Sequence, residues 1–225
     1  MKKINGMNAF ERWDKASPED LRKNPKLLPT FKEIGVHMVF DIKLDGNFTR
    51  KARLVADGHK TDAPECSTYS SVVSRESVRI ALLYASLNDL DVLSCDVANA
   101  YLCADCKEKV WIKARKEFGS DEGAVIIIRK ALYGLKSAGN SWHNLLCETI
   151  LKMGYENTIA DPDVWRRRAR DKNGHDYYEL LLVYVDDIMC VSTTPGNSIA
   201  IIGSLYDLKE AAKEPDMYLG TTIGK

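Results

Sequence analysis

The chain has 225 residues, of which 45% are hydrophobic, enough for one large or two small domains with a buried core. This composition excludes collagenous, fibrous and disordered classes. No apolar run reaches the roughly 18 residues that a membrane span needs, so a soluble protein without a membrane partner is expected. Basic and acidic side chains number 32 each, so the whole chain has no net charge that would attract nucleic acid.

Residues 1–60 depart from this balance, with 13 basic against eight acidic side chains. A local basic face is what phosphate binding requires, although solvated lysines on an ordinary surface give the same count.

Six scattered cysteines, and an N-terminus without the apolar core of a signal peptide, predict a reducing, intracellular setting. Cys103 and Cys106 match the C-x-x-C pattern. No second pair follows at zinc-site spacing, which favours two free thiols over a structural zinc.

The first predicted elements are a lead-in and a hairpin. Residues 1–30 are polar and hold three of the seven prolines, which predicts a helical or irregular segment before a fold that begins near Thr30. Residues 37–57 alternate in polarity on both sides of Asp45-Gly46, a dipeptide that favours a tight turn between two strands.

The middle of the chain predicts a helix, a strand and a second helix. Residues 74–90 have apolar side chains at helical spacing behind a capping Ser74. Residues 91–104 begin as a strand and continue into a turn or helix, with Asp96 at the junction. Residues 142–155 have one apolar helical face and end at Gly154.

The last third predicts antiparallel strands and a closing helix. Asn173-Gly174 is a strong hairpin signal, and a second tight turn would place Asp186 and Asp187 at a hairpin tip. Residues 198–212 have a helical pattern. Helices interspersed with largely antiparallel strands predict an α+β fold with the helices on one face of the sheet.

The stretch LLLVYVDDIMCVS, residues 180–192, puts two adjacent carboxylates inside a run that is ready for burial. A buried carboxylate is costly unless it is paired, hydrogen-bonded or bound to a cation. With Asp96 at the end of a neighbouring strand, Asp186 and Asp187 can hold two divalent cations, an arrangement that serves in-line phosphoryl transfer. An isolated pair of aspartates is more often part of an exposed turn.

Four segments together are more specific than the aspartate pair. The segments KARLVADG (51–58), DVANAY (96–101), LYGLKSAGNSW (132–142) and YVDD (184–187) resemble, in order and spacing, the reverse transcriptases of copia-type retrotransposons. The resemblance extends from about Thr30 to Lys225. It implies an RNA-directed DNA polymerase of right-hand fold, with residues 31–225 as fingers and palm, and nothing after about Leu219 resembles a thumb or a ribonuclease H.

The resemblance also implies roles for individual residues. Asp96, Asp186 and Asp187 match the catalytic aspartates, which would bind two Mg²⁺ ions, with Mn²⁺ as an alternative. Tyr101 matches the aromatic residue that excludes a 2′-hydroxyl. The remaining nucleotide-binding residues implied are Lys51, Arg53 and Tyr184. Lys51 and Arg53 alternate along a predicted strand, so both can point to one face, either toward triphosphate or template phosphates or as solvated edge charges. The partners would be an RNA template, a DNA or RNA primer and deoxynucleotides, in a cytoplasmic particle or the nucleus, and no oligomeric state is predicted.

Three residues depart from the family pattern. Many members read LYGLKQAPR, so Ser137, Gly139 and Asn140 replace a glutamine, a proline and an arginine in a segment that lines the nucleotide pocket of the family. This puts nucleotide affinity in doubt.

A predicted strand carries a row of arginines. Alternation along it would put Arg166, Arg168 and Arg170 on one side, either as a nucleic-acid contact or as a solvated face.

Three functions therefore compete. The first is nucleotidyl transfer from a deoxynucleotide to a primer 3′-hydroxyl on an RNA template. The second is a weak or inactive retrotransposon remnant that at most binds nucleic acid. The third is a two-metal phosphohydrolase or nucleotide cyclase, which would leave the basic strand at 51–58 and the LYGLK segment unexplained.

Overall fold

A computed structural model of the chain describes residues 7–13, 30–42, 48–215, 217–218 and 221–223. Its contacts divide the chain into two compact units. Unit 1 comprises residues 1–69 and 101–142, and unit 2 comprises residues 70–100 and 143–225. Each unit has its own sheet.

Unit 1 contains a four-stranded sheet of order β1-β7-β6-β2, in which only the β2–β6 pair is parallel. Its strands are β1 (Phe10–Arg12), β2 (Lys32–Glu33), β6 (Val110–Lys113) and β7 (Val125–Ile128). The expectation that the fold begins near Thr30 is wrong for β1, which pairs with β7. Phe10 also packs edge-on against Phe118, which gives this part of the lead-in an apolar anchor.

The predicted hairpin in unit 1 is confirmed. Strands β3 (Val36–Ile42) and β4 (Arg50–Ala56) pair antiparallel along their full length, and the predicted turn at Asp45-Gly46 lies outside the described residues. Two 3₁₀ turns, η4 (Gly58–Lys60) and η5 (Lys116–Asp121), also belong to unit 1. Helices α3 (Ala100–Cys103) and α4 (Ala138–Lys152) each contain residues of both units.

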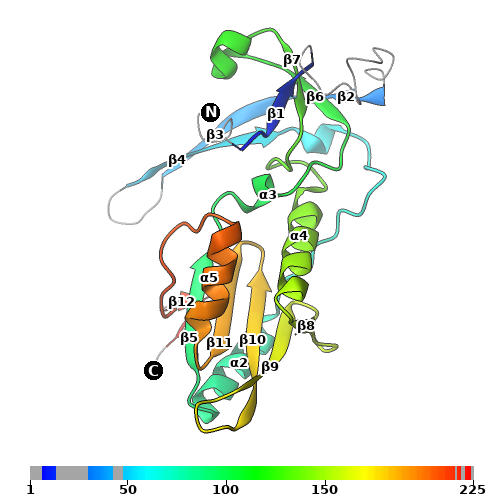
Figure 1. The fold of residues 1–225 in the computed structure, drawn as a ribbon. Helices are drawn as coiled ribbons and strands as arrows, with labels where there is room; N and C mark the ends of the chain where they lie inside the picture. Colours follow the sequence, from blue (N-terminus) through cyan, green and yellow to red (C-terminus); the bar gives the residue numbers. More distant parts are fainter. Residues whose placement is uncertain (1–6, 14–29, 43–47, 216, 219–220, 224–225) are drawn as a thin grey trace. The chain divides into compact units, whose positions relative to one another are not determined.

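Unit 2 is built on a five-stranded sheet of order β5-β11-β10-β9-β8, antiparallel throughout (Figure 1). Its strands are β5 (Asp91–Asp96), β8 (Glu156–Asn157), β9 (Val164–Arg170), β10 (Asp176–Tyr184) and β11 (Asp187–Ser192). The predicted hairpin at Asn173-Gly174 connects β9 to β10, with Gly174 at a φ of 86° that suits glycine. Two short strands, β12 (Met217–Tyr218) and β13 (Thr221–Thr222), form a separate pair.

Helix α2 (Arg75–Leu87) covers one face of this sheet. The Ser74 side chain accepts a hydrogen bond from the Ser77 backbone N–H, as the sequence predicted for an N-cap. Val78, Ala81 and Ala85 pack with Leu182 and Met189 in one buried cluster. Leu83 and Leu87 of the same helix are exposed.

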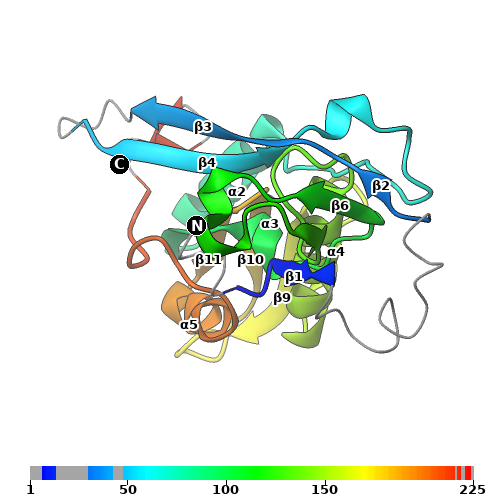
Figure 2. The same cartoon turned by 90° about the horizontal axis from the view of Figure 1, so that it is seen from above.

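Helix α5 (Pro195–Leu205) covers the opposite face, as Figure 2 shows for α2 and α5 about β10 and β11. Successive side chains of a strand point to opposite faces, so Glu179 lies on the other side of β10 from Leu182. The Tyr155 hydroxyl donates to Glu179 and also shares a hydrogen bond with the Ser198 hydroxyl of α5, so α5 lies on the Glu179 side of the sheet. The prediction of helices on one face is therefore wrong, because β10 and β11 are apolar on both faces and need cover on each side.

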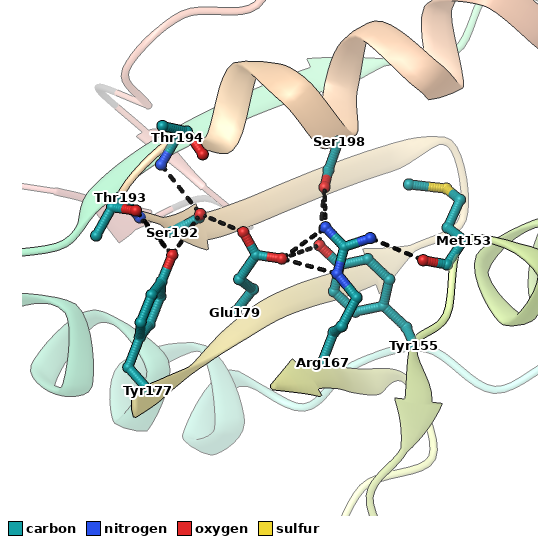
Figure 3. A network of polar contacts seen from close by, with 9 residues as sticks. All are labelled: Met153, Tyr155, Arg167, Tyr177, Glu179, Ser192, Thr193, Thr194 and Ser198. Atoms are coloured by element: carbon teal, nitrogen blue, oxygen red, sulfur yellow. Dashed lines mark hydrogen bonds and ion pairs between the residues drawn. The ribbon is translucent and has the colours of Figure 1, made fainter. Parts of the chain in front are cut away.

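A buried polar network joins the sheet to α5 (Figure 3). Arg167 Nη2 donates to Glu179 Oε2 at 2.6 Å, and Nη1 donates to the Met153 carbonyl oxygen at 2.7 Å. The other carboxylate oxygen of Glu179 accepts a hydrogen bond from the Ser192 hydroxyl, and Tyr155 and Ser198 share a hydrogen bond between their hydroxyls. Both Glu179 oxygens are thus satisfied, which is what makes this buried charge tolerable.

Candidate active site

The site is built on two strand ends of unit 2. Asp96 is the last residue of β5 and Asp187 is the first residue of β11, and the two lie directly opposite in the antiparallel ladder. Directly paired residues have Cβ atoms about 5 Å apart, so these two carboxylates share one small region of the sheet surface. The fold brings together residues that are distant in the sequence, as the sequence predicted.

Asp186 occupies the turn between β10 and β11. Tyr184 pairs with Asp187, which leaves Val185 and Asp186 as a two-residue turn. Val185 has a φ of 57°, a conformation that matches tight hairpin turns but is strained for a β-branched residue. The Asp186 carbonyl oxygen accepts a hydrogen bond of 2.9 Å from the Val97 amide, which fixes the turn beside the end of β5. The predicted hairpin tip is confirmed, with Asp186 in the turn and Asp187 just inside β11.

The electrostatics of the site reflect three carboxylates crowded in a half-buried place. Burial is the main cause that raises the pKa of Asp187 to about 6, and the charges of Asp96 and Asp186 add to it. Burial also raises the pKa of Asp96, although an ammonium beside it acts in the opposite direction. A cation bound here would therefore offset the repulsion among the three carboxylates.

That ammonium belongs to Lys209, a residue that sequence reasoning missed. Its Nζ lies 2.5 Å from Asp96 Oδ2 and 2.9 Å from Asp186 Oδ2. The pattern predicted a helix through residue 212, but α5 ends at Leu205. Residues 207–213 instead bond to the outer edge of β5, whose backbone groups would otherwise lack a partner on that side. The sequence carries no signal for this change beyond the proline at 215.

The donor set agrees in kind with a divalent metal. Carboxylate oxygens are the ligands that Mg²⁺ prefers, and Asp96 Oδ1 is buried without a hydrogen-bond partner. Within the described ranges, however, no group of three or more His, Cys, Asp or Glu side chains has the geometry to hold a metal ion. The oxygens are instead arranged around the ammonium of Lys209.

Tyr184, predicted to bind nucleotide, lies beside the three aspartates at the end of β10 and is half-buried. The other predicted nucleotide-binding residues belong to unit 1. Lys51 and Arg53 are alternate residues of β4 and lie on one face of the hairpin, as predicted. Tyr101 is in α3 and its ring contacts that of Tyr133, with centroids 4.8 Å apart. Their roles stay predictions.

The LYGLK segment has a structural task inside unit 1. The Tyr133 carbonyl oxygen accepts a hydrogen bond of 2.7 Å from the Ala56 amide, and Lys136 Nζ donates to the Thr61 carbonyl oxygen at 2.5 Å. Gly134 has a φ of 89°, and a Cβ atom there would lie 2.1 Å from the Ala56 carbonyl oxygen. Only glycine allows this approach of the segment to the end of β4.

Two of the departures from the family pattern make internal hydrogen bonds. The backbone N–H and hydroxyl of Ser137 both donate to Glu108 Oε1, and Asn140 Nδ2 donates to the Tyr69 carbonyl oxygen at 2.6 Å. Both side chains are buried. These substitutions are therefore accommodated by the local structure, and their effect on nucleotide affinity stays a prediction.

The strand β9 carries the arginine row. Arg166, Arg168 and Arg170 are exposed on one side, as the alternation predicted. Each of the three has a local partner: Arg166 pairs with Glu156, Arg170 pairs with Asp176, and the Arg168 Nε donates to the Tyr178 hydroxyl. These contacts are compatible with either predicted role.

A second charged pair in unit 2 was also missed. His143 Nε2 lies 2.6 Å from Oδ1 of the fully buried Asp163, and the sequence pattern indicates no role for either residue. The hydrogen bond to Asp163 is the main cause that raises the pKa of His143 to about 10, and a contact with Cys147 contributes. His143 is in α4 and Asp163 is 20 positions later, in the turn before β9, so no local sequence pattern predicts the pair.

The comparisons with known proteins agree with the resemblance noted in the sequence. Residues 20–221 match the family model described as "Reverse transcriptase (RNA-dependent DNA polymerase)". A Pol polyprotein of the transposon TNT 1-94 from Nicotiana tabacum is 31% identical over 76% of the chain, and one of the transposon RE2 from Arabidopsis thaliana is 30% identical over 91%. The Ty1-BL Gag-Pol polyprotein of Saccharomyces cerevisiae is 29% identical over 92% of the chain.

The chain spans only 11–13% of the length of these relatives. Their names describe polyproteins of transposons, so the match concerns one segment of each. In the part of the chain that the structure describes, no helix is both long enough and apolar enough to cross a membrane.

Proposed function

Because this chain belongs to the reverse transcriptase (RNA-dependent DNA polymerase) family, we propose that it is the polymerase segment of a copia-type retrotransposon Pol polyprotein. Its reaction would be attack of a primer 3′-hydroxyl on the α-phosphate of a deoxynucleotide, with pyrophosphate as the leaving group and RNA as the template. In this proposal unit 2 is the palm and unit 1 the fingers.

The observation that carries the proposal is the meeting of Asp96, Asp186 and Asp187 at adjacent strand ends. Two Mg²⁺ ions, or Mn²⁺, held by these carboxylates would supply charge neutralisation and activation of the attacking oxygen. The unpartnered Asp96 Oδ1 gives the set an oxygen that is ready for a ligand. The raised pKa of Asp187, about 6, means that this carboxylate is mostly ionised only above that pH.

The remaining residues would bind and orient the substrates. Tyr101 would exclude a 2′-hydroxyl, and Lys51 and Arg53 would contact phosphates of the nucleotide or template. Tyr184 would lie beside the incoming nucleotide, next to the aspartate turn. The strained Val185 would hold the turn in the conformation that presents Asp186.

The test is primer extension on poly(rA)·oligo(dT) with Mg²⁺ over a salt series, with products resolved on a gel. We expect short products at low salt. Their amount should fall steeply as the salt concentration rises, because binding to primer and template depends on counterion release. Asp186→Asn should reduce extension by about a hundredfold or more, because a metal-binding carboxylate is lost. Asp176→Asn, an exposed carboxylate on β10, is the matched control and should retain wild-type extension.

Two outcomes would contradict the proposal. Equal extension by wild type and Asp186→Asn would show that the three aspartates do not form the catalytic site. No extension by folded wild type at any salt would favour the alternative of an inactive remnant that at most binds nucleic acid.

A further inference from the structure

The ammonium of Lys209 occupies the position of a shared ligand in the aspartate site. Its Nζ contacts one carboxylate oxygen of Asp96 and one of Asp186, at 2.5 and 2.9 Å. These two side chains come from different elements, the end of β5 and the β10–β11 turn. One positive charge thus bridges two negative ones, which is the task that the proposed function gives to a divalent metal.

The backbone holds Lys209 at this place independently of its side chain. The Lys209 amide donates a hydrogen bond to the Asp96 carbonyl oxygen, and the Ala98 amide donates to that of Asp207. Ser94 and Lys213 exchange two further backbone bonds at the other end of the segment. Residues 207–213 are therefore fixed along the edge of β5, and the Lys209 side chain can leave the carboxylates without any change in this pairing.

The ammonium can be replaced. The Lys209 side chain is 39% exposed, so its charge can move into water on a flexible four-carbon stem at little cost. The ammonium uses only part of the site, since it contacts one oxygen of Asp96 and one of Asp186, and the buried Asp96 Oδ1 has no hydrogen-bond partner. A divalent cation can neutralise more of this charge than Lys209 does.

We infer that Lys209 is an internal counter-cation of the aspartate site, which holds Asp96 and Asp186 together without metal and is displaced when a divalent metal binds. The inference rests on the proposed metal site and adds a competitor to it. It also explains why carboxylate oxygens that suit a divalent metal are arranged around the ammonium of Lys209. Metal affinity is then set in part by the strength of the Lys209 contacts.

The direct test uses the wild-type chain. Lysines would be acylated at pH 8 with an N-hydroxysuccinimide ester, with and without saturating Mg²⁺, and the labelling rate of each lysine read by peptide mass spectrometry. Displacement should raise the rate at Lys209 about fivefold, the scale of a lost part-exposed ion pair. Lys213 is the matched internal control, because it lies on the same segment and pairs with Glu210 rather than with the site.

Variants supply an independent measurement. Lys209→Met should bind Mn²⁺ about tenfold more tightly in a calorimetric titration, because the competitor is gone. Lys213→Met removes the same charge from the same segment and should bind Mn²⁺ like wild type. Lys209→Arg, which keeps the charge, should also stay close to wild type.

The outcomes separate this inference from the function beneath it. If wild type binds Mn²⁺ but Mg²⁺ leaves Lys209 labelling unchanged, or Lys209→Met binds no more tightly than Lys213→Met, the inference is overturned and the metal site stands. If neither wild type nor Lys209→Met binds the metal, both the inference and the proposed metal site fail.

Discussion

Asp187 gives the sharpest test of the electrostatics of the site. Its pKa is raised from 3.8 to about 6, first by burial and then by the charges of Asp96 and Asp186. A carboxyl whose pKa is higher in the folded than in the unfolded chain favours its neutral form on folding. Its contribution to stability is therefore fully present below pH 3.8 and is lost as the pH rises through 6. Asp187→Asn removes this loss.

The size of the effect follows from the shift. Each unit of pKa corresponds to about 1.4 kcal/mol, so a shift of roughly two units sets an upper bound near 3 kcal/mol. Asp187 is only half-buried, and solvent screening reduces the value. We expect Asp187→Asn to raise the free energy of unfolding by about 1–2 kcal/mol at pH 8 and by much less at pH 4.

Urea unfolding in EDTA at pH 4 and pH 8 measures this difference. Asp176→Asn, an exposed carboxylate on β10, controls for the chemical change and should show no comparable gain at pH 8. With saturating Mg²⁺ the wild type should become more stable than Asp187→Asn, because metal that binds only the folded chain stabilises the protein that keeps all three carboxylates. A difference between wild type and Asp187→Asn that is the same at both pH values in EDTA would refute the reasoning.

Three further predictions concern residues other than the three aspartates. Glu179→Gln should lower the free energy of unfolding by about 3 kcal/mol in urea, because it breaks a buried ion pair, whereas Asp176→Asn should cost less than about 1 kcal/mol. His143→Gln should cost about 2–3 kcal/mol at pH 6 by leaving Asp163 buried without its partner, and the cost should shrink as the pH rises from 6.5 through 10, where the histidine itself loses its charge. Tyr101→Ala should raise the ratio of ribonucleotide to deoxynucleotide kcat/KM in primer extension, and an unchanged ratio would make Tyr101 only a packing residue.

The local patterns of the sequence predicted most of the elements of unit 2. The Ser74 cap, the Asn173-Gly174 turn and the tight turn before Asp187 each depend on a few neighbouring residues. Such signals survive in a single sequence because the backbone geometry needs those residue types. The meeting of Asp96 with Asp187 was predicted from strand ends and from the family resemblance together.

The errors lie where non-local pairing overrides a local pattern. The run 198–212 has a helical pattern, but β5 is an edge strand, and its free backbone groups bind residues 207–213 in place of two helical turns. Helices on one face would have left the other apolar face of β10 and β11 uncovered. Phe10–Arg12 similarly joins a sheet because Phe118 and β7 lie beside it.

The wrongly predicted segment at 207–213 also contributes a residue to the site, Lys209. A helix through residue 212 would have carried this lysine away from β5 as one more solvated charge. The edge pairing instead places its backbone against Asp96 and its ammonium between two aspartates. The backbone pairing with β5 that replaces the helix thus also brings a positive charge, which offsets part of the negative charge of the three carboxylates in the absence of metal. The aspartates belong to recognisable sequence motifs, whereas nothing adjacent to Lys209 in the sequence specifies which edge its segment binds.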